Sequence, residues 1–258
     1  MKVITIANQK GGSGKTCTAA NLAEMIAGDG FRVLCIDLND QSDLTETMGA
    51  RPGGECVGLF TGKDPAKLVR ESNILRVELI PAGDEIALLD IKLKESGRER
   101  ALLLDKALKP LRRSYRYCII DAPGTFNTAL LNALAVSDYV IIPTQADVFS
   151  LKGIRRMIAN IRQVRETVNP DLKIAGILLT RYQGRRNLSK ETIELLQAAE
   201  KTTGATLFKS TIRESVKIAE APGHKKTVIA YAPSSNGAAD YKAFYKELQE
   251  ILSEGKDR

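Results

Sequence analysis

The sequence predicts an α/β fold in which helices cover both faces of a twisted, mostly parallel sheet. Short apolar runs, each suited to a buried strand, alternate with longer runs whose apolar residues recur three and four positions apart. Several of the short runs end in a glycine loop or an acidic residue, as in sheets whose strand carboxyl ends gather at one edge. This alternation implies right-handed crossovers and three layers.

The apolar runs predict the strands in order. They cover Val3–Ala7, Arg32–Asp37, Ile74–Pro81, Tyr115–Asp121, Asp138–Pro143, Lys173–Thr180 and the short pair Val228–Ile229. The helical spacings predict helices over Ala19–Ala27, Glu85–Leu93, Arg100–Leu111, Leu151–Val168, Ser189–Lys201 and Ala238–Leu252. The segment 39–93 is less regular, with a loop at 51–54 and a helix start at Asp64-Pro65.

The chain has 258 residues, of which 43% are hydrophobic. One α/β domain of this length can bury a full core, so we expect a single domain over residues 1–258. The first predicted strand begins within the first three residues, so we expect no helix-turn-helix module and no signal peptide before it. No apolar run is long enough to span a membrane.

The composition is basic, with a formal net charge of +7 and a pI of about 9.2. Such an excess suits a polyanionic partner, through counterion release from nucleic acid or attraction to anionic lipid. An unspecialised basic surface would carry the same excess without a partner. The single histidine, His224, cannot build a metal site alone, and we expect it at the surface.

The four cysteines lie far apart in the sequence and lack the spacing of a disulfide framework or a metal site. They are Cys17, Cys35, Cys56 and Cys118. Cys35 and Cys118 fall inside predicted strands, where a cysteine behaves as a small core residue. The pattern favours a reducing compartment.

A glycine loop connects the first predicted strand to the first predicted helix. It reads Lys10-Gly11-Gly12-Ser13-Gly14-Lys15-Thr16, followed by Cys17. Glycines let successive backbone N–H groups turn inward toward an anion, and the helix adds the positive end of its dipole. Lys15 would then reach the β- and γ-phosphates of a nucleotide, and Thr16 would bind Mg²⁺. The simpler interpretation is a glycine turn that contains lysines.

This stretch resembles the deviant Walker A box of the ParA/MinD ATPases, because Gln9 occupies the first glycine position of the usual motif and a second lysine, Lys10, follows it. The resemblance implies a three-layer P-loop NTPase fold. It further implies that Gly11 to Cys17 bind Mg-ATP and that Lys10 reaches across a dimer interface to the partner's nucleotide. Later stretches, among them Asn132-Ala133-Leu134 and Val216 to Pro222, resemble the chromosomal ParA or Soj-like branch.

Acidic residues end two further predicted strands. Asp121 has the Walker B position, and Asp37 ends the second strand; both suit Mg²⁺ held through water, although Asp121 could instead cap a helix or turn. In the family this strand ends in Asp-x-Asp-Pro-Gln, whereas this chain reads Asp37-Leu38-Asn39-Asp40-Gln41. Here Asn39 replaces the acid that the family uses to position the attacking water, and Asp40 replaces the proline. We therefore expect ATP binding with slow hydrolysis.

The resemblance also assigns binding residues in the later part of the chain. Arg213 stands where the family has a proline near the adenine. The family's DNA-binding arginines correspond to Arg185 and Lys217. Arg186, Lys225 and Lys226 lie close to them in the sequence. A solvated charged face is the simpler interpretation of this set.

These expectations define a ParA-type ATPase that forms an ATP sandwich dimer and binds DNA without sequence specificity to segregate a plasmid, chromosome or integrative element. A ParB-like protein would stimulate hydrolysis, in the nucleoid region of a bacterial cytoplasm. A MinD-like membrane-associated ATPase is disfavoured by the polar tail, residues 252–258. A non-hydrolysing nucleotide switch stays open because of Asn39. A ligase or reductase on the same fold fits least.

Overall fold

The structure is a computed structural model that describes residues 1–93, 97–145, 148–183 and 205–254. Within these ranges its centre is an eight-stranded sheet in the order β3-β4-β2-β5-β1-β6-β7-β8. The strands are β1 (Lys2–Ile6), β2 (Val33–Asp37), β3 (Arg70–Glu71), β4 (Val77–Ile80), β5 (Tyr117–Asp121), β6 (Tyr139–Gln145), β7 (Lys173–Tyr182) and β8 (Leu207–Arg213). Of these strands only β3 runs antiparallel to its neighbour, so the prediction of a mostly parallel sheet is confirmed.

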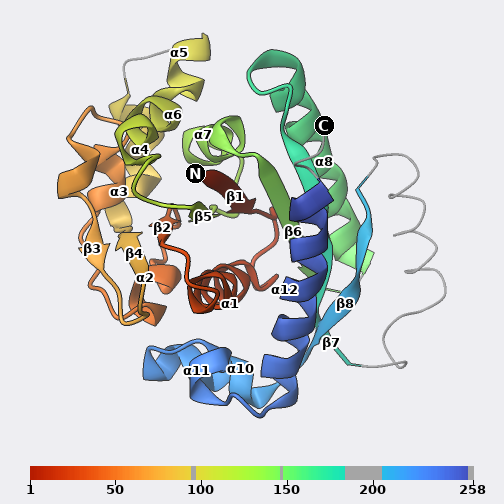
Figure 1. Cartoon of the computed structure of the whole chain (residues 1–258). Coiled ribbons are helices and arrows are strands. Elements are labelled where there is room, and N and C mark those ends of the chain that lie inside the picture. Colours follow the sequence, from red (N-terminus) through yellow and green to blue (C-terminus); the bar gives the residue numbers. More distant parts are fainter. Residues whose placement is uncertain (94–96, 146–147, 184–204, 255–258) are drawn as a thin grey trace.

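Helices lie on both faces of this sheet (Figure 1). The α-helices are α1 (Lys15–Gly28), α2 (Asp43–Thr47), α3 (Glu55–Gly58), α4 (Leu89–Lys92), α5 (Gly97–Ala101), α6 (Leu103–Leu108), α7 (Thr128–Val136), α8 (Val148–Thr167), α10 (Val216–Glu220), α11 (Val228–Tyr231) and α12 (Asn236–Glu254). Short 3-10 helices are η1 (Pro65–Lys67), η2 (Asp84–Leu88), η3 (Lys109–Leu111) and η5 (Ala221–His224). None of the helices in the described ranges is both long and apolar enough to cross a membrane.

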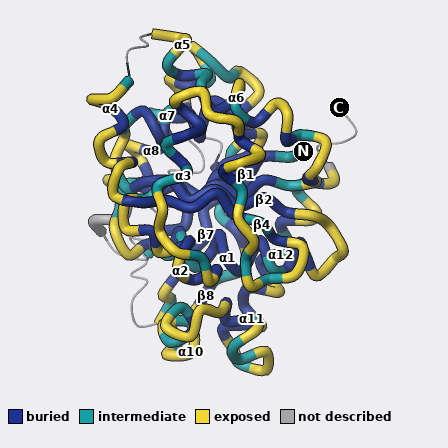
Figure 2. Tube along the Cα trace, turned by 90° about the vertical axis from the view of Figure 1, so that its left-hand side faces the viewer, coloured by how far each residue is buried: buried dark blue, intermediate teal, exposed yellow. Residues whose placement is uncertain are grey.

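The alternation of side chains along each strand divides the core between the two faces of the sheet. Ile4 and Ile6 of β1 pack toward α1 and α12. Val3 belongs to the opposite cluster, where β2, β4 and β5 meet α6 and α7. A third cluster joins β6 and β7 to α7 and α8. Because both faces are covered, the strands read as continuous apolar runs and form a buried centre (Figure 2).

Several predicted elements are confirmed and others are corrected. The helix start at Asp64-Pro65 is η1, where the Asp64 carboxylate accepts a hydrogen bond from the Ala66 N–H. The continuous helix predicted over 100–111 is wrong, because the chain breaks there into α5, α6 and η3. Strand β8 and helix α7 were not predicted as elements. The helix expected over 189–201 lies outside the described residues.

The short strand predicted at Val228–Ile229 is also wrong, since these residues open α11. The Thr227 hydroxyl caps this helix by accepting a hydrogen bond from the Ala230 N–H at 3.3 Å. The Asn21 side-chain oxygen accepts from the Val228 N–H at 3.1 Å. A short apolar run has no periodicity of its own, and here side-chain capping decides in favour of the helix.

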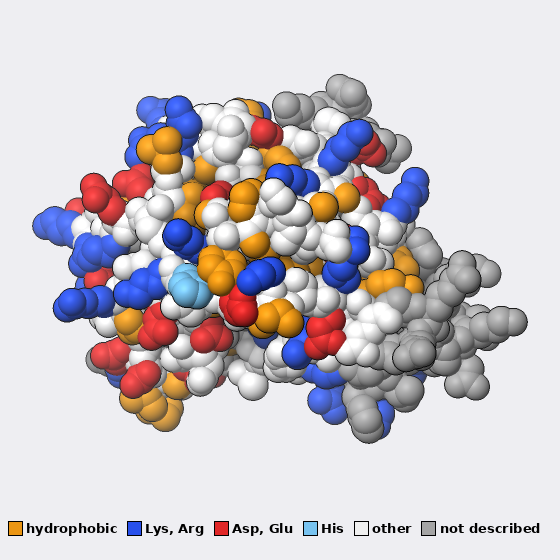
Figure 3. Space-filling model, turned by 90° about the horizontal axis from the view of Figure 1, so that it is seen from below, with side chains coloured by type: hydrophobic (Ala, Val, Ile, Leu, Met, Phe, Trp, Pro, Cys, Tyr) orange, Lys and Arg blue, Asp and Glu red, His pale blue; other side chains and the backbone are white. Residues whose placement is uncertain are grey.

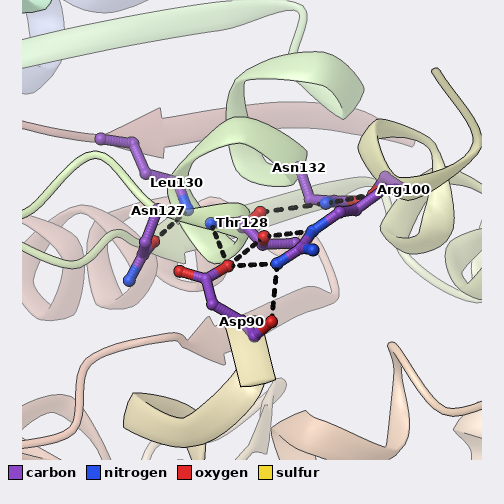
Figure 4. A network of polar contacts seen from close by, with 6 residues as sticks. All are labelled: Asp90, Arg100, Asn127, Thr128, Leu130 and Asn132. Carbon is purple, nitrogen blue, oxygen red and sulfur yellow. Dashed lines mark hydrogen bonds and ion pairs between the residues drawn. The ribbon is translucent and has the colours of Figure 1, made fainter. Parts of the chain in front are cut away.

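A partly buried polar network fixes the start of α7, the helix that follows the loop after β5 (Figure 4). The Asn132 side chain is fully buried, and it accepts from the Leu104 N–H and donates to the carbonyls of Arg100 and Thr128, at 2.7 to 3.0 Å. The Thr128 hydroxyl bonds the Asp90 carboxylate, which also pairs with Arg100. Side chains thus join α4, α5 and α6 to α7.

We predict that Asn132→Ala lowers the free energy of unfolding by roughly 2–4 kcal/mol, because it leaves the Leu104 N–H and the Arg100 carbonyl buried without partners. Urea unfolding followed by circular dichroism would measure this loss. Glu250→Ala on the exposed face of α12 is the control, with an expected change within about 0.5 kcal/mol. Equal effects of the two substitutions would contradict a structural role for the network.

Candidate nucleotide site

The glycine loop connects β1 to α1 at the carboxyl edge of the sheet, as predicted. Gly12 and Gly14 have φ values of 69° and 85°, in the left-handed region that glycine tolerates best. A Cβ on Gly14 would also lie 3.3 Å from the Thr180 methyl group. Two of the three loop glycines are therefore required by backbone conformation, and Gly14 by packing as well.

Two side chains from neighbouring strands hold the outer part of this loop. The Thr180 hydroxyl of β7 donates to the Ser13 carbonyl at 2.8 Å, and Gln145 of β6 donates to the Gly12 carbonyl at 2.6 Å. Neither residue was predicted as a site residue. The feature that could have identified them is their position at the carboxyl end of a parallel strand, where polar residues gather around a ligand.

Lys15 begins α1 and turns back over the loop. Its ammonium group is buried and donates to the Lys10 carbonyl at 3.4 Å. Burial lowers the pKa of Lys15 from its ordinary value, and the carboxylates of Asp121 and Asp43 oppose that shift. A partly desolvated ammonium at the start of a helix is suited to bind a phosphate group.

Thr16 and Asp121 face each other beside Lys15. The Thr16 hydroxyl donates to one Asp121 carboxylate oxygen at 2.6 Å. The other oxygen is buried and has no hydrogen-bond partner among the described residues. Burial, and then the nearby Asp37, raise the pKa of Asp121 above its usual range. A buried carboxylate oxygen without a donor is the kind of group that a bound cation satisfies.

Asp37 lies next to Asp121, because β2 and β5 pair in parallel with these residues in register. Its carboxylate accepts hydrogen bonds from the Thr45 hydroxyl at 2.7 Å, the Thr45 N–H at 2.9 Å and the Asn39 N–H at 3.0 Å. Burial raises the pKa of Asp37. Asp37 therefore fixes the chain into α2, a role that the sequence did not predict, and any contact with a metal would be through water.

These groups fit Mg²⁺. Thr16 and Asp121 would hold the ion, with Asp37 behind them, and Mg²⁺ supplies neutralisation of phosphate charge when bound. Hard oxygen donors of this kind are the ligands that Mg²⁺ prefers. The chain's own contribution is to hold Thr16 and Asp121 together before the ion binds.

Asn39, Asp40 and Asp43 all line the cavity that opens over the glycine loop. Asn39 is half-buried, and its side-chain oxygen accepts from the Gln41 N–H at 3.4 Å. Asp40 is exposed. Asp43, in the first turn of α2, interacts electrostatically with Lys15 and was not predicted as a site residue. It places a carboxylate on the same cavity that Asn39 lines.

The cavity has a volume of about 870 Å³ and extends from the glycine loop to the end of β8. Arg213 lines it there, near Pro222 and Tyr241. The Arg213 guanidinium makes two bonds of 2.7 Å to the Asp240 carboxylate, which also accepts from the Arg213 N–H at 3.0 Å. This pairing holds Arg213 at the end of the cavity where the family resemblance expects the base.

The remaining predicted residues are Lys10 and the basic residues expected to bind DNA. Lys10 is half-buried at the start of the loop. Lys217 is exposed on α10, where it pairs with Glu220 at 2.9 Å and lies over the Tyr231 ring. Lys225 and Lys226 are exposed at the end of η5. Arg185 and Arg186 lie outside the described residues.

Several known proteins with similar sequences carry the names Soj or ParA. A family model described as "AAA domain" matches residues 1–174. The sporulation initiation inhibitor protein Soj of Bacillus subtilis is 34% identical, over 96% of this chain and 98% of its own length. The chromosome-partitioning ATPase Soj of Thermus thermophilus is 35% identical, over 97% and 96%. The chromosome partitioning protein ParA of Caulobacter vibrioides is 32% identical, over 100% and 96%.

Solved structures agree with the fold. Cobyrinic acid a,c-diamide synthase of Mycobacterium smegmatis, with a bound ATP analog and magnesium, superposes with a TM-score of 0.82 at 26% identity, over 99% of this chain and 97% of that one. Apo McdA of Cyanothece gives 0.85 at 25% identity, over 98% and 99%. With full-length relatives above 30% identity and the glycine loop inside the matched domain, the chain belongs to the ParA/Soj family of P-loop ATPases, which use Mg-ATP.

Proposed function

We propose that this chain binds Mg-ATP, dimerises around two ATP molecules and then binds DNA without sequence specificity, in order to segregate a plasmid, chromosome or integrative element. The observation that carries the proposal is the group of Lys15, Thr16 and Asp121 beneath a cavity of about 870 Å³. A cavity of this size accommodates a nucleotide. A ParB-like protein would stimulate hydrolysis, and the dimer would associate with the nucleoid.

Dimerisation is supported by the second lysine of the loop. Lys15 already provides a buried ammonium on the inner side of the loop, next to Asp121. One nucleotide requires one such lysine, so Lys10 would serve the nucleotide of a facing subunit. The 32–35% identity to Soj and ParA proteins over nearly the whole chain supports the same arrangement.

DNA binding is supported by the net charge of +7 and by the exposure of Lys217, Lys225 and Lys226. Figure 3 shows the face with α10, η5 and α11, where Lys and Arg side chains surround the single histidine and acidic side chains lie among them. Binding through such residues would depend steeply on salt and little on sequence.

Two further candidate functions make different predictions. A MinD-like ATPase would bind vesicles in the presence of ATP, and a flotation assay separates this class from a DNA-binding one. A non-hydrolysing switch would bind ATP and dimerise without turnover. Asn39 is the residue that favours the switch, because an amide orients water but is a very poor base.

We predict that Lys15→Ala weakens ATP binding by roughly 100-fold or more, because it removes charge-assisted hydrogen bonds to the phosphates. Isothermal titration calorimetry with Mg-ATP measures the affinity, and the melting temperature checks that the variant is folded. Lys63→Ala, at an exposed lysine outside the cavity lining, is the matched control. Unchanged affinity in Lys15→Ala would refute the nucleotide site.

We predict that Lys10→Ala retains ATP binding by the monomer but loses the ATP-induced dimer. Removing Lys10 takes away a cation that would meet the partner's nucleotide, and it leaves Lys15 in place. Multi-angle light scattering with and without ATP measures the mass, with Lys63→Ala again as control. An ATP-dependent dimer that persists in Lys10→Ala would show that this lysine does not act across the interface.

We predict that Asn39→Asp raises the single-turnover rate of hydrolysis by on the order of 10²-fold, because it restores a charged acceptor for the proton of the attacking water. The assay contains DNA and the cognate ParB-like protein. Asp40→Asn and Asp43→Asn are companion variants that test whether either neighbouring carboxylate already takes this role. Equal rates for the wild type and the Asn39→Asp variant would exclude the water-positioning function of this residue.

A further inference from the structure

Basic residues stand at the amino end of neighbouring strands, opposite the nucleotide site. Arg76, Arg32 and Arg116 directly precede β4, β2 and β5, which are consecutive in the sheet. We call these three arginines the amino-edge row. No function was predicted for them from the sequence.

Backbone hydrogen bonds fix the order of the row. The Val33 N–H donates to the Arg76 carbonyl at 2.9 Å, and the Arg116 N–H donates to the Arg32 carbonyl at 2.9 Å. Adjacent strands lie about 4.8 Å apart, so the three residues follow one another across the edge of the sheet. Their spacing is therefore set by the sheet and not by flexible loops.

All three side chains of the row are exposed. Arg32 is partly engaged, since it pairs with Glu78 at 2.6 Å and lies over the Tyr115 ring at 5.1 Å. Arg76 and Arg116 form no ion pair with any residue in the described ranges. The row thus presents two guanidinium groups without an ion-pair partner, those of Arg76 and Arg116. They flank the guanidinium of Arg32, which Glu78 holds in place.

The loop that carries Arg76 contacts the basic end of η5. Asn73, three residues before Arg76, donates a side-chain hydrogen bond to the Lys225 carbonyl. Lys225 and Lys226 are both exposed at this contact. Among the acidic residues nearby, Glu78 is paired with Arg32, and Asp29 accepts hydrogen bonds from Tyr245 and Gln249 at 2.7 Å. Glu71 is exposed opposite Glu78.

We propose that the amino-edge row, together with Lys225 and Lys226, forms one continuous track that binds the phosphate backbone of duplex DNA. This inference rests on the proposed DNA-binding function and extends its surface beyond α10 and η5. Arginine suits phosphate because its guanidinium makes two parallel hydrogen bonds to it. Contacts to phosphate carry no sequence information, in agreement with non-specific binding.

The amino-edge row lies at the amino ends of the strands, whereas the glycine loop of the nucleotide cavity lies at their carboxyl ends. Lys225 and Lys226 follow Pro222, which lines the end of the cavity away from that loop. DNA on the row would therefore leave the glycine loop open. An anionic membrane is the less suitable ligand, because Phe31 and Leu75 are the large apolar side chains exposed on the segments that carry the row. Membrane-surface binding requires a wider apolar face than two such residues provide.

The test compares the salt dependence of DNA binding in the full chain with Mg-ATP. Fluorescence anisotropy with a random-sequence duplex gives the affinity over a range of KCl concentrations. The track variant is Arg76→Gln with Arg116→Gln, which removes two charges but keeps the backbone bonds. A second variant is Lys225→Gln with Lys226→Gln. The matched control is Arg98→Gln with Lys106→Gln, on α5 and α6 at the far side of the molecule from α10 and α11 (Figure 1).

Each lost phosphate contact reduces the magnitude of the negative slope of log affinity against log salt by about 0.9. The slope of the track variant should therefore be smaller in magnitude by about 1.8 per protomer in contact with DNA. The control should keep the wild-type slope, and all variants should keep their calorimetric affinity for ATP. A track variant that matches the control overturns the track and leaves DNA binding elsewhere. No binding by the wild type overturns both proposals. Row-dependent binding to phosphatidylglycerol vesicles in place of DNA overturns the choice of ligand.

Discussion

Two buried carboxylates, Asp37 and Asp121, lie side by side because parallel pairing of β2 and β5 puts them in register. Neither ionises easily next to the other in a dry environment. The two carboxylates differ in the hydrogen bonds that they receive. Asp37 receives three hydrogen bonds from Thr45 and Asn39, whereas Asp121 receives one from Thr16 and keeps an unpaired oxygen near the Lys15 ammonium. The first carboxylate therefore stabilises the fold, and the second is suited to a cation.

The rest of the site depends on the same edge of the sheet. The glycine loop comes shortly after β1, and side chains at the ends of β6 and β7 bond its Gly12 and Ser13 carbonyls. Its N–H groups are then held for an anion at little cost in ordering when the ligand arrives. Preorganisation of this kind follows from parallel topology, because only parallel strands bring so many carboxyl ends together.

This dependence on topology explains which features the sequence could predict. Strands buried on both faces appear in the sequence as continuous apolar runs. The glycine loop comes shortly after one such run and Asp121 ends another, so their positions in the fold were predicted correctly. Thr180 and Gln145 act through positions that only the strand order defines, and Asp43 contacts the site from a five-residue helix without periodicity. Val228 was misassigned because its helix depends on capping by Thr227 and on a hydrogen bond that the Val228 N–H donates to the distant Asn21.

The two ends of the sheet also differ in charge for a physical reason. At the carboxyl end, burial beneath a cavity makes each ionised group costly, and the groups there act through few, well-aligned partners. At the amino end, Arg76 and Arg116 are exposed to water, where a charge costs little and its attraction for other charges is screened by salt. Such a salt-sensitive attraction, summed over many contacts, suits a polyanion that must be held and released, whereas a desolvated site with well-aligned partners suits a single nucleotide. One parallel sheet can therefore support both kinds of binding without competition for the same surface.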